Sequence, residues 1–220
     1  QAVKLPGIQP LAPQDWLRPD EAFAGQMQRR ADLLAGRRQD VVRLAPFALE
    51  AAQELLQTVL DHLYPDAGQE ILRPDGARAA IDWQDPLGTL GRITQQDFCL
   101  LQKPQGSAEH VLTGAILCFP ASWTLAEKFM RPLIGIHETV DSYDESIAKR
   151  VQRLFDGVQP GRPLWRFNAL WYQDPELYAP RSIHDPRDKS HGCDAPYMRS
   201  EQQVILRLPQ SRAVVFSIHT

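Results

Sequence analysis

The sequence has few cysteines, no excess of basic residues and no long apolar run. Its 220 residues include three cysteines and carry a formal net charge of −3. An odd cysteine count without a Cys-x-x-Cys pair is not a disulfide framework, so it favours a reducing compartment. No window approaches the roughly 18 consecutive apolar residues of a membrane-spanning helix, and the missing basic excess argues against a general nucleic-acid-binding protein. We therefore expect a cytoplasmic protein that binds neither membranes nor nucleic acids.

The sequence also lacks the short motifs of several large enzyme classes. It contains no GxGxxG or GxxxxGK[ST] phosphate loop, no HExxH zinc motif and no GxSxG nucleophile motif. Each of these motifs places backbone N–H groups or a reactive side chain where that chemistry needs them. Their absence gives little support to nucleotide-dependent chemistry or to a serine hydrolase.

What the sequence does contain is an ordinary globular composition with one unusual count. Hydrophobic residues make up 43% of the chain and charged residues 23%, which is typical of a folded domain. Proline accounts for 18 of the 220 residues, about 8% against a usual 5%. A chain of this length can bury about 70% of its unfolded surface, so we expect one large domain or two small ones, with many tight connections.

Two amphipathic helices are predicted in the N-terminal part of the chain. Asp20 can cap a helix whose apolar residues recur at helical spacing until Gly36, and a second helix begins at Pro46 and carries an apolar stripe up to Leu63. The residues that follow, 64–92, contain three turn signals, YPDAG, RPDGAR and DWQDPLG. We expect residues 1–92 to form an N-terminal arm and helical extension that packs on a core at residues 93–220.

Five strands are predicted in this core. The apolar runs that indicate them occupy residues 97–103, 110–119, 164–172, 201–209 and 212–220. Short polar turns separate the first two and the last two, so each of these pairs forms a hairpin. A helical block between the two strand groups has capping boxes at Thr124–Glu127 and Ser142–Glu145. We therefore expect an α+β fold: a PAS-like antiparallel five-stranded sheet with helices on one face, plus the N-terminal helical extension.

His137 is the histidine whose position suggests chemistry. It follows the apolar stretch RPLIGI and precedes the helix predicted to start at Ser142. In a PAS-like fold an imidazole at this point can face the ligand cavity on the concave side of the sheet, as an axial haem ligand or as a group that binds a haem propionate. The alternative is a hydrogen-bonded structural histidine, or one at the surface.

A second group of possible ligands lies in the polar segment RSIHDPRDKSHGCDAP. His184, His191 and Cys193 are residue types that bind zinc. Their spacing matches no standard zinc module, and the segment is rich in turn-forming residues. A loop that covers a cavity is the better interpretation.

The strand at 164–172 places polar residues among aromatic ones. Trp165 and Trp171 point to one side, and Arg166 and Asn168 point to the other, because successive side chains of a strand alternate. If the second side lines a cavity, Arg166 and Asn168 are polar groups inside an otherwise apolar pocket, which is typical of small-molecule sites. The alternative is an arginine exposed on a sheet face.

Arg199 and Glu201 share one face near the start of the next strand. An arginine there can bind a propionate through its planar fork, and a buried carboxylate can hold a cationic amine. The alternative is an ion pair between strands, in which the two residues serve stability.

Four stretches of the sequence resemble one protein family. They are PLAPQDWLRPDEAFAGQMQRRADLL, CFPASWTLAEKFMRPLIGIHETV, VQPGRPLWRFNALW and RSEQQVILRLPQSRAVVFSI. Together they span roughly residues 8–220, and they resemble the alpha subunit of haem-dependent oxidative N-demethylases. Relatives usually read R-x-E-R-Q-T-L-x-R-L-P in the last stretch, where this chain has Gln202 and Val204 in place of Arg and Thr.

This resemblance implies a PAS-like core that binds haem b, with His137 as the candidate ligand of the haem iron. It also implies the oxidative demethylation of a small secondary amine such as dimethylamine with O2. Electrons then come from a flavin and iron–sulfur reductase subunit, and a tetrahydrofolate-binding subunit can accept the formaldehyde equivalent.

The resemblance also implies roles for the other candidate residues. The catalytic candidates are Glu201 and Arg199, and the candidates for cofactor binding besides His137 are Arg199, Arg166, Asn168 and Trp165. The protonated amine is held by the Glu201 carboxylate or by the faces of the tryptophans at 165 and 171. An alternative function is a PAS-like sensor that binds haem or another small ligand without turnover, and a third is a structural subunit without a cofactor.

Overall fold

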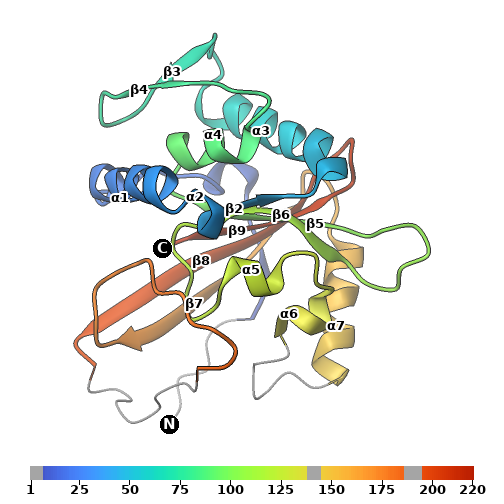
Figure 1. The fold of residues 1–220 in the computed structure, drawn as a ribbon. Coiled ribbons are helices and arrows are strands. Elements are labelled where there is room, and N and C mark those ends of the chain that lie inside the picture. Colours follow the sequence, from blue (N-terminus) through green and yellow to red (C-terminus); the bar gives the residue numbers. More distant parts are fainter. Residues whose placement is uncertain (1–6, 138–144, 186–194) are drawn as a thin grey trace.

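One antiparallel sheet lies between two groups of helices in the computed structural model, which describes residues 7–137, 145–185 and 195–220 (Figure 1). The sheet has seven strands, which in their order across it are β1 (Gln9–Pro10), β7 (Leu164–Tyr172), β8 (Tyr197–Arg207), β9 (Val214–His219), β5 (Asp97–Gln102), β6 (Val111–Ile116) and β2 (Val42–Leu44). Every neighbouring pair runs antiparallel. An α+β fold with a large antiparallel sheet is therefore confirmed.

The five long strands lie in the segments where the sequence predicts strands. β5 and β6 form one hairpin, and β8 and β9 form another, across a turn in which the N–H of Leu208 donates to the carbonyl of Ala213 at 2.9 Å. The sheet exceeds the predicted five strands because β1 and β2, of two and three residues, extend its two edges. Their sequences, QP and VRL, are too short to show the alternation that identifies a strand.

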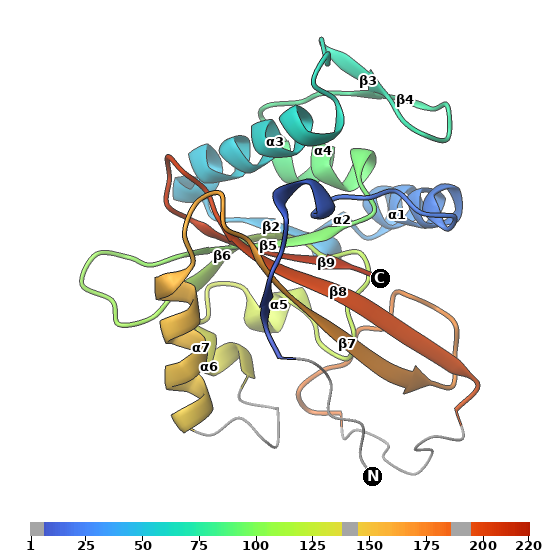
Figure 2. The ribbon, with the colours of Figure 1, turned by 180° about the vertical axis from the view of Figure 1, so that it is seen from behind.

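The first group of helices covers one face of the sheet and comes from the N-terminal part of the chain (Figures 1 and 2). Its members are η1 (Pro13–Asp15), α1 (Phe23–Gly36), α2 (Arg38–Val41), η2 (Pro46–Ala48), α3 (Leu49–Leu63) and α4 (Pro86–Ile93). The apolar stripe of α3, with Leu55 and Leu56, belongs to one buried cluster with Phe98 and Leu100 of β5. Burial of this stripe is what stabilises the helix in its place on the sheet.

Residues 64–92 contain more regular structure than their turn signals indicate. They form a separate hairpin of β3 (Glu70–Leu72) and β4 (Arg78–Ala80), and they form α4. The sequence of α4, PLGTLGRI, is buried on nearly all sides, so it lacks the polar face by which an amphipathic helix is recognised. Its Gly91 lies so close to β6 that a Cβ atom there would be 2.9 Å from Cδ1 of Ile116. A glycine that suggests a helix breaker in the sequence thus permits close packing.

The second group of helices covers the opposite face and consists of α5 (Leu125–Lys128), α6 (Leu133–His137) and α7 (Glu145–Gly157) (Figures 1 and 2). Helices therefore lie on both faces of the sheet: α5–α7 cover one face, and the N-terminal helices pack directly on the strands from the other. α5 begins after Thr124, whose hydroxyl donates to Oε2 of Glu127 at 2.7 Å. Ser142, in the second predicted capping box, lies outside the described residues.

The alternation of side chains along each strand decides which residues face which group of helices. In β8, Val204 and Leu206 belong to the buried cluster that contains the α3 stripe. Ile205 belongs to the other cluster, which contains Leu133 of α6 and Phe155 of α7. The odd-numbered residues of β8 therefore point toward the second group of helices. We name this side of the sheet the α7 face.

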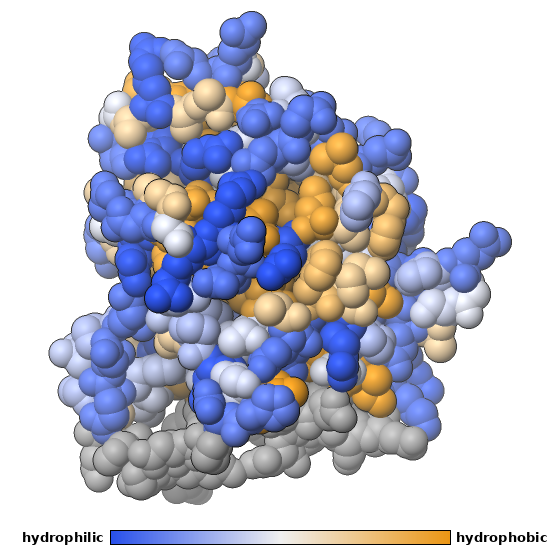
Figure 3. Space-filling model, viewed as in Figure 1, coloured by the Kyte–Doolittle hydropathy of each residue, from blue (hydrophilic) through white to orange (hydrophobic). Residues whose placement is uncertain are grey.

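The surface seen in Figure 3 is apolar in its middle and polar around it. Apolar residues gather over the edge of the sheet at β2, where Val42 and Leu44 are half-buried. Phe47 of η2 is 61% exposed. None of the helices in the described ranges has both the length and the hydrophobicity needed to cross a membrane.

Candidate functional site

A row of polar side chains lies on the α7 face of strands β7 and β8. Arg199, Glu201 and Gln203 follow one another at two-residue spacing along β8, and Glu201 pairs in register with Asn168 and Gln203 with Arg166 of β7. All five side chains therefore point to the same side of the sheet. We name these five residues the inner polar row. It brings two cations, one carboxylate and two amides together in a small area.

The carboxylate of Glu201 is the centre of the inner polar row. Its Oε1 accepts a hydrogen bond from Nε of Arg199 at 3.1 Å, and its Oε2 accepts bonds from Nε2 of Gln203 at 2.7 Å and Nδ2 of Asn168 at 3.4 Å. Gln203 in turn accepts at Oε1 a bond from Nε of Arg166 at 2.6 Å. A carboxylate offers about four acceptor positions, so these three donors leave room for one more.

Arg199 is held on all sides by the rest of the fold. Its side chain and that of Glu201 are each 6% exposed. Its Nη1 donates to the carbonyl of Leu177 at 2.8 Å, and its Nη2 donates to the carbonyl of Phe119 and to Oγ1 of Thr220, the latter at 3.4 Å. The structure therefore shows an ion pair along one strand, in which the guanidinium also ties β8 to two neighbouring segments.

Arg166 differs from Arg199 because most of its guanidinium has no partner among the described residues. Its one hydrogen bond within the described part of the chain is the bond from Nε to Gln203. More than a third of the residue is exposed. Burial of the remaining part of the side chain lowers the pKa of Arg166, and the negative charge of Glu201 opposes this effect. Its free Nη1 and Nη2 groups form the planar fork that binds carboxylates.

Tyr172 carries a second unused polar group on this face. Its hydroxyl is buried, and nothing in the described part of the chain bonds to it. Tyr172 lies four residues after Asn168 in the same strand, so the two side chains share a side of the sheet. A buried polar group without a partner costs about 1–3 kcal/mol. The hydroxyl is therefore a polar group on this face that a ligand or an ordered water molecule can satisfy.

Half-buried apolar side chains occupy the same face of the sheet as the inner polar row. Those that pack against the buried cluster of the α7 face are Trp123, Ile136, Val151, Leu154, Leu164 and Phe216. Leu164 precedes Arg166 by two residues in β7, and Phe216 pairs with Ile205 of β8. The α7 face therefore combines an apolar surface that is partly open to solvent with charged and polar groups at its margin.

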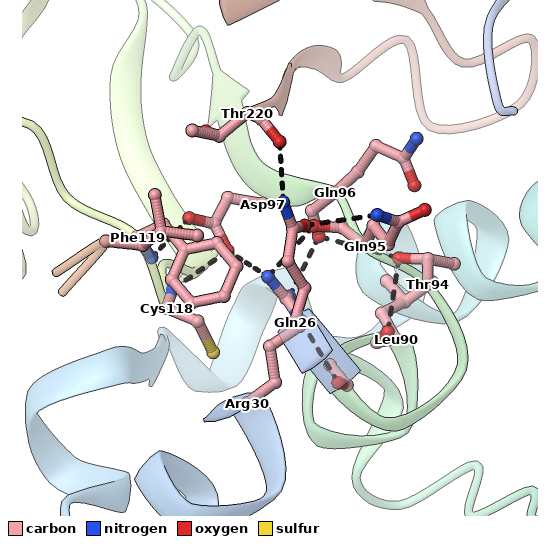
Figure 4. Close-up of polar contacts among 12 residues, drawn as sticks. Gln26, Arg30, Leu90, Thr94, Gln95, Gln96, Asp97, Cys118, Phe119 and Thr220 are labelled. Atoms are coloured by element: carbon pink, nitrogen blue, oxygen red, sulfur yellow. Dashed lines mark hydrogen bonds and ion pairs between the residues drawn. The ribbon is translucent and has the colours of Figure 1, made fainter. Parts of the chain in front are cut away.

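A buried ion pair joins α1 to β5, and Figure 4 shows its surroundings. Nη1 of Arg30 lies 2.7 Å from Oδ1 of Asp97, and neither side chain is more than 2% exposed. Arg30 also donates to three backbone carbonyls, those of Gly91, Gln95 and Gln96. Burial of a charge is costly unless it is paired and hydrogen-bonded, and this arrangement satisfies both conditions.

Asp97 connects this ion pair to the inner polar row. Its two carboxylate oxygens accept the backbone N–H groups of Cys118 at 2.8 Å and Phe119 at 2.7 Å (Figure 4). The carbonyl of Phe119 accepts a hydrogen bond from Arg199. Two side chains therefore hold the segment that leads from β6 to α5. Asp97 accepts hydrogen bonds from the N–H groups of this segment, and Arg199 donates to one of its carbonyls.

The two described cysteines are not reactive groups. Cys99 and Cys118 are buried free thiols. Burial raises the pKa of the Cys118 thiol to about 12, although the charge of Arg30 opposes this, and burial also raises the pKa of Cys99. Because the thiolate is the reactive form, both thiols are inert at neutral pH.

The tryptophans of β7 do not join the inner polar row. Trp165 lies on the opposite side of β7 from Arg166 and packs against the cluster that contains the α3 stripe. It therefore shares no pocket with the inner polar row. Trp171 lies on that opposite side too and is 47% exposed.

The histidine and cysteine candidates are placed only in part. His137 is the last residue of α6, and its side chain lies outside the described residues. His184 is exposed, whereas His191 and Cys193 lie outside the described residues. Within residues 7–137, 145–185 and 195–220, no group of three or more His, Cys, Asp or Glu side chains is arranged to hold a metal ion.

Sequence reasoning missed Gln203 and Tyr172 as members of this site. Gln203 has the same two-residue spacing from Glu201 that Arg199 has, so strand alternation is the signal that identifies it. The same alternation connects Tyr172 to Arg166 and Asn168. The pair of Arg30 and Asp97 joins positions 67 residues apart, and no local pattern marks such a contact.

A comparison with protein families matches nearly the whole chain. The family described as haem-dependent oxidative N-demethylase, alpha subunit-like, matches residues 7–220. The match therefore includes the inner polar row, the buried ion pair and the helices on both faces of the sheet.

Proposed function

The chain belongs to the haem-dependent oxidative N-demethylase, alpha subunit-like family, and we propose that it binds haem b between the inner polar row and helices α5–α7. We further propose that it carries out the oxidative N-demethylation of a small secondary amine. The observation that supports this best is the half-open apolar surface of the α7 face, which has a largely unpaired guanidinium, that of Arg166, at its margin.

The described residues fit the chemistry of haem. The group is a flat apolar ring that carries two propionate carboxylates. Ile136, Leu154 and Phe216 supply half-buried apolar side chains, and the free Nη1 and Nη2 of Arg166 suit a propionate as a bidentate partner. The buried hydroxyl of Tyr172, which bonds to nothing in the described ranges, supplies one more polar group.

The order of the strands supports a PAS-like core. Across the sheet the five long strands run β7-β8-β9-β5-β6, and in the sequence α5–α7 lie between β6 and β7. This is the element order of a PAS-like domain, in which the ligand lies between the sheet and that helical segment. We propose that residues 1–92 extend this core as part of one structural unit, so that the α7 face remains the ligand side.

We propose His137 as the ligand of the haem iron. The backbone of α6 ends at this residue. Leu133 and Ile136 of the same helix pack in the apolar cluster of the α7 face, so the helix is anchored on the side where we place the haem. Imidazole is a common axial ligand of haem iron.

Haem supplies the oxidative chemistry with O2 when it is bound, and the residues of the chain hold and orient the substrate. Glu201 is the candidate for binding the protonated amine, because its carboxylate has one acceptor position left and water is largely excluded around it. Arg199 acts as a positioning residue, since its Nε keeps Oε1 of Glu201 in place. Gln203 and Asn168 fix Oε2 in the same way.

The reaction needs electrons from outside the chain. The family description names an alpha subunit, which implies an enzyme of several subunits. We propose a flavin and iron–sulfur reductase subunit as the electron donor. A tetrahydrofolate-binding subunit is the proposed acceptor of the formaldehyde equivalent.

An absorption titration of the purified protein with hemin tests cofactor binding. One haem per chain should bind with a Soret band, and His137→Ala should shift that band. Arg166→Gln should weaken haem binding about tenfold, the effect of losing charge-assisted hydrogen bonds worth about 1.5 kcal/mol. Arg78→Gln, which removes an exposed arginine from β4, is the matched control. Failure to bind hemin would reject the proposed function, and an unchanged spectrum in His137→Ala would reject this ligand.

Formaldehyde release from dimethylamine, with O2 and a surrogate reductant, tests turnover. Haem-dependent release of formaldehyde supports the demethylase. Glu201→Gln should lower kcat/KM for the amine while the Soret band stays in place. Haem binding without any product would instead favour a sensor that binds haem without turnover.

A further inference from the structure

A separate polar pocket lies at the other end of strand β8 from Arg199. It has a volume of about 270 Å³ and is lined by residues from the end of β5, the start of β6, the turn between β8 and β9, and the end of α7. Ala213 is the one apolar residue among those that line it. Pockets for larger ligands are mostly apolar, so this pocket suits a small polar molecule.

The pocket carries an excess of positive charge. Lys103, Arg207 and Arg212 line it, together with one carboxylate, that of Asp156. Partial burial raises the pKa of Asp156, but hydrogen bonds from Lys103 and Gln152 outweigh this effect and hold the pKa below its ordinary value. The carboxyl group is therefore ionised at neutral pH. Nζ of Lys103 lies 2.9 Å from Oδ1 of Asp156. These two charges offset each other, and the charges of two guanidinium groups remain.

Among the described residues, the hydrogen-bond partners of the Arg207 guanidinium are backbone carbonyls and include no carboxylate. Its Nε donates to the carbonyl of Val158 at 2.7 Å, its Nη1 to that of Arg212 at 2.6 Å and its Nη2 to that of Phe155. These bonds cap the end of α7 and fix the guanidinium in the wall of the pocket. The pKa of Arg207 is lowered by partial burial and also by the charge of Arg212. Two like charges held near each other attract an anion between them.

Arg212 is fixed by its backbone and not by its side chain. Its φ of 60° lies in the left-handed region, in the turn between β8 and β9. Its carbonyl is held by Arg207, whereas its exposed side chain forms no hydrogen bond or ion pair with the described residues. Asn and Gly adopt this backbone conformation more readily than Arg. The guanidinium is therefore presented at the pocket and remains available to a ligand.

His110 and Ser211 add neutral donors to the lining. Oε1 of Gln152 accepts the backbone N–H of His110 at 3.1 Å, so Nε2 of Gln152 donates to Nδ1 of the ring at 2.9 Å. The neutral imidazole then carries its proton on Nε2. Burial lowers the pKa of His110 and keeps the ring neutral at pH 7. The oxygen of Ser211 accepts the N–H of Ala213 at 3.3 Å, which leaves the hydroxyl proton free to donate.

We propose that this pocket binds a small dianion, a phosphate group or a dicarboxylate. The anion lies between the guanidinium groups of Arg207 and Arg212, with Lys103 beside it. Ser211 and His110 belong to the same lining, and in the proposed site their O–H and Nε2–H complete the shell of donors. This ligand class differs from a cationic amine and from an apolar ring, so the pocket is a second site and does not depend on the proposed function of the α7 face.

Calorimetric titration with inorganic phosphate, and separately with succinate, tests the proposal at constant ionic strength. At least one of the two should bind saturably, with one site per chain. Arg212→Gln should weaken that binding at least tenfold, because it removes the free guanidinium and its charge and leaves a neutral polar side chain. Arg78→Gln removes the same charge from the separate β3–β4 hairpin and should bind like the unmodified protein.

The outcomes separate the possible ligands. Preference for phosphate assigns the site to phosphate groups, and preference for succinate assigns it to dicarboxylates. No saturable binding of either at about 10 mM, well above the millimolar range of weak ligands, overturns the proposal. Equal weakening by Arg78→Gln overturns it too, because that result indicates attraction to the whole surface. Lys103→Gln is the second variant and should also weaken binding, and a thermal melt of each variant verifies that it is folded.

Discussion

Replacement of Arg30 with leucine should destabilise this protein strongly. The guanidinium is fully buried and donates four hydrogen bonds, to the carbonyls of Gly91, Gln95 and Gln96 at 3.2, 3.1 and 2.8 Å and to Oδ1 of Asp97 at 2.7 Å. A leucine leaves Asp97 as a buried carboxylate without a counter-charge. It also leaves three backbone carbonyls without the donor that satisfies them.

The size of the effect follows from these contacts. Removal of one partner from a buried ion pair costs about 3–5 kcal/mol. The two backbone N–H groups that still bind Asp97 reduce this cost, and the carbonyls left without donors increase it. We expect the free energy of unfolding to fall by about 4 kcal/mol. At about 2–4 °C per kcal/mol for a chain of this length, Tm should fall by about 8–16 °C.

Urea denaturation, followed by tryptophan fluorescence and by circular dichroism, measures this loss. Arg29→Leu is the control, because Arg29 is the preceding residue of α1 and forms an exposed ion pair with Glu176, which is worth less than about 1 kcal/mol. Arg30→Lys keeps the charge without the planar fork, so its loss of unfolding free energy should lie between those of Arg30→Leu and Arg29→Leu. If Arg30→Leu unfolds within about 1 kcal/mol of Arg29→Leu, the reasoning on the buried pair is refuted.

Three further outcomes are expected for variants at other positions. Gln203→Leu removes the amide between Arg166 and Glu201, and it should lower the free energy of unfolding by about 1–3 kcal/mol, since buried groups lose their partner; an unchanged urea midpoint would contradict this role. Arg207→Met removes the side-chain cap of α7, so hydrogen exchange should become faster in the last turn of that helix and stay unchanged in α3. Burial lowers the pKa of His110 in the folded state, so below pH 6.5 the unfolded state binds the extra proton; the contribution of this residue to stability should therefore fall by at most about 1.4 kcal/mol per pH unit below pH 6.5 and stay level above it. His110→Gln should make the slope shallower, and part of the slope should remain because burial also lowers the pKa of His62.

Much of the fold could be predicted from local patterns. Strands β5, β6, β7, β8 and β9 have apolar runs of strand length bounded by turn residues, and α3 has a wide apolar stripe. These signals depend on neighbouring residues alone. The short edge strands and α4 were missed because their sequences carry no such local signal. α4 is buried on nearly all sides, so its sequence shows no contrast between a polar and an apolar face.

The candidate site was predictable only where it follows strand alternation. The positions of Arg166 and Asn168 on one side of β7, and of Arg199 and Glu201 on one side of β8, follow from a period of two residues. What each side chain binds does not follow from it. The guanidinium of Arg199 donates to the carbonyls of Leu177 and Phe119, which lie 22 and 80 residues away in the sequence, whereas that of Arg166 has one partner, Gln203, within the described ranges. Partners at such separations depend on how distant segments pack.

The strands of the sheet become less buried from β5 and β6 toward β7, and this difference explains where a ligand can lie. β5 and β6 are covered on both faces and are almost entirely buried, whereas β7 is only half-buried along most of its length. The sequences agree, because DFCLLQ is nearly continuous in apolar residues and LWRFNALWY mixes Arg and Asn with aromatic residues. On the α7 face the buried charges of Arg199 and Glu201 are paired with each other, whereas a guanidinium such as that of Arg166, which has no carboxylate partner among the described residues, is tolerated only where this burial is incomplete. The same incomplete burial leaves room for a ligand beside β7, so the polar residues of this strand and the proposed haem site have one physical cause.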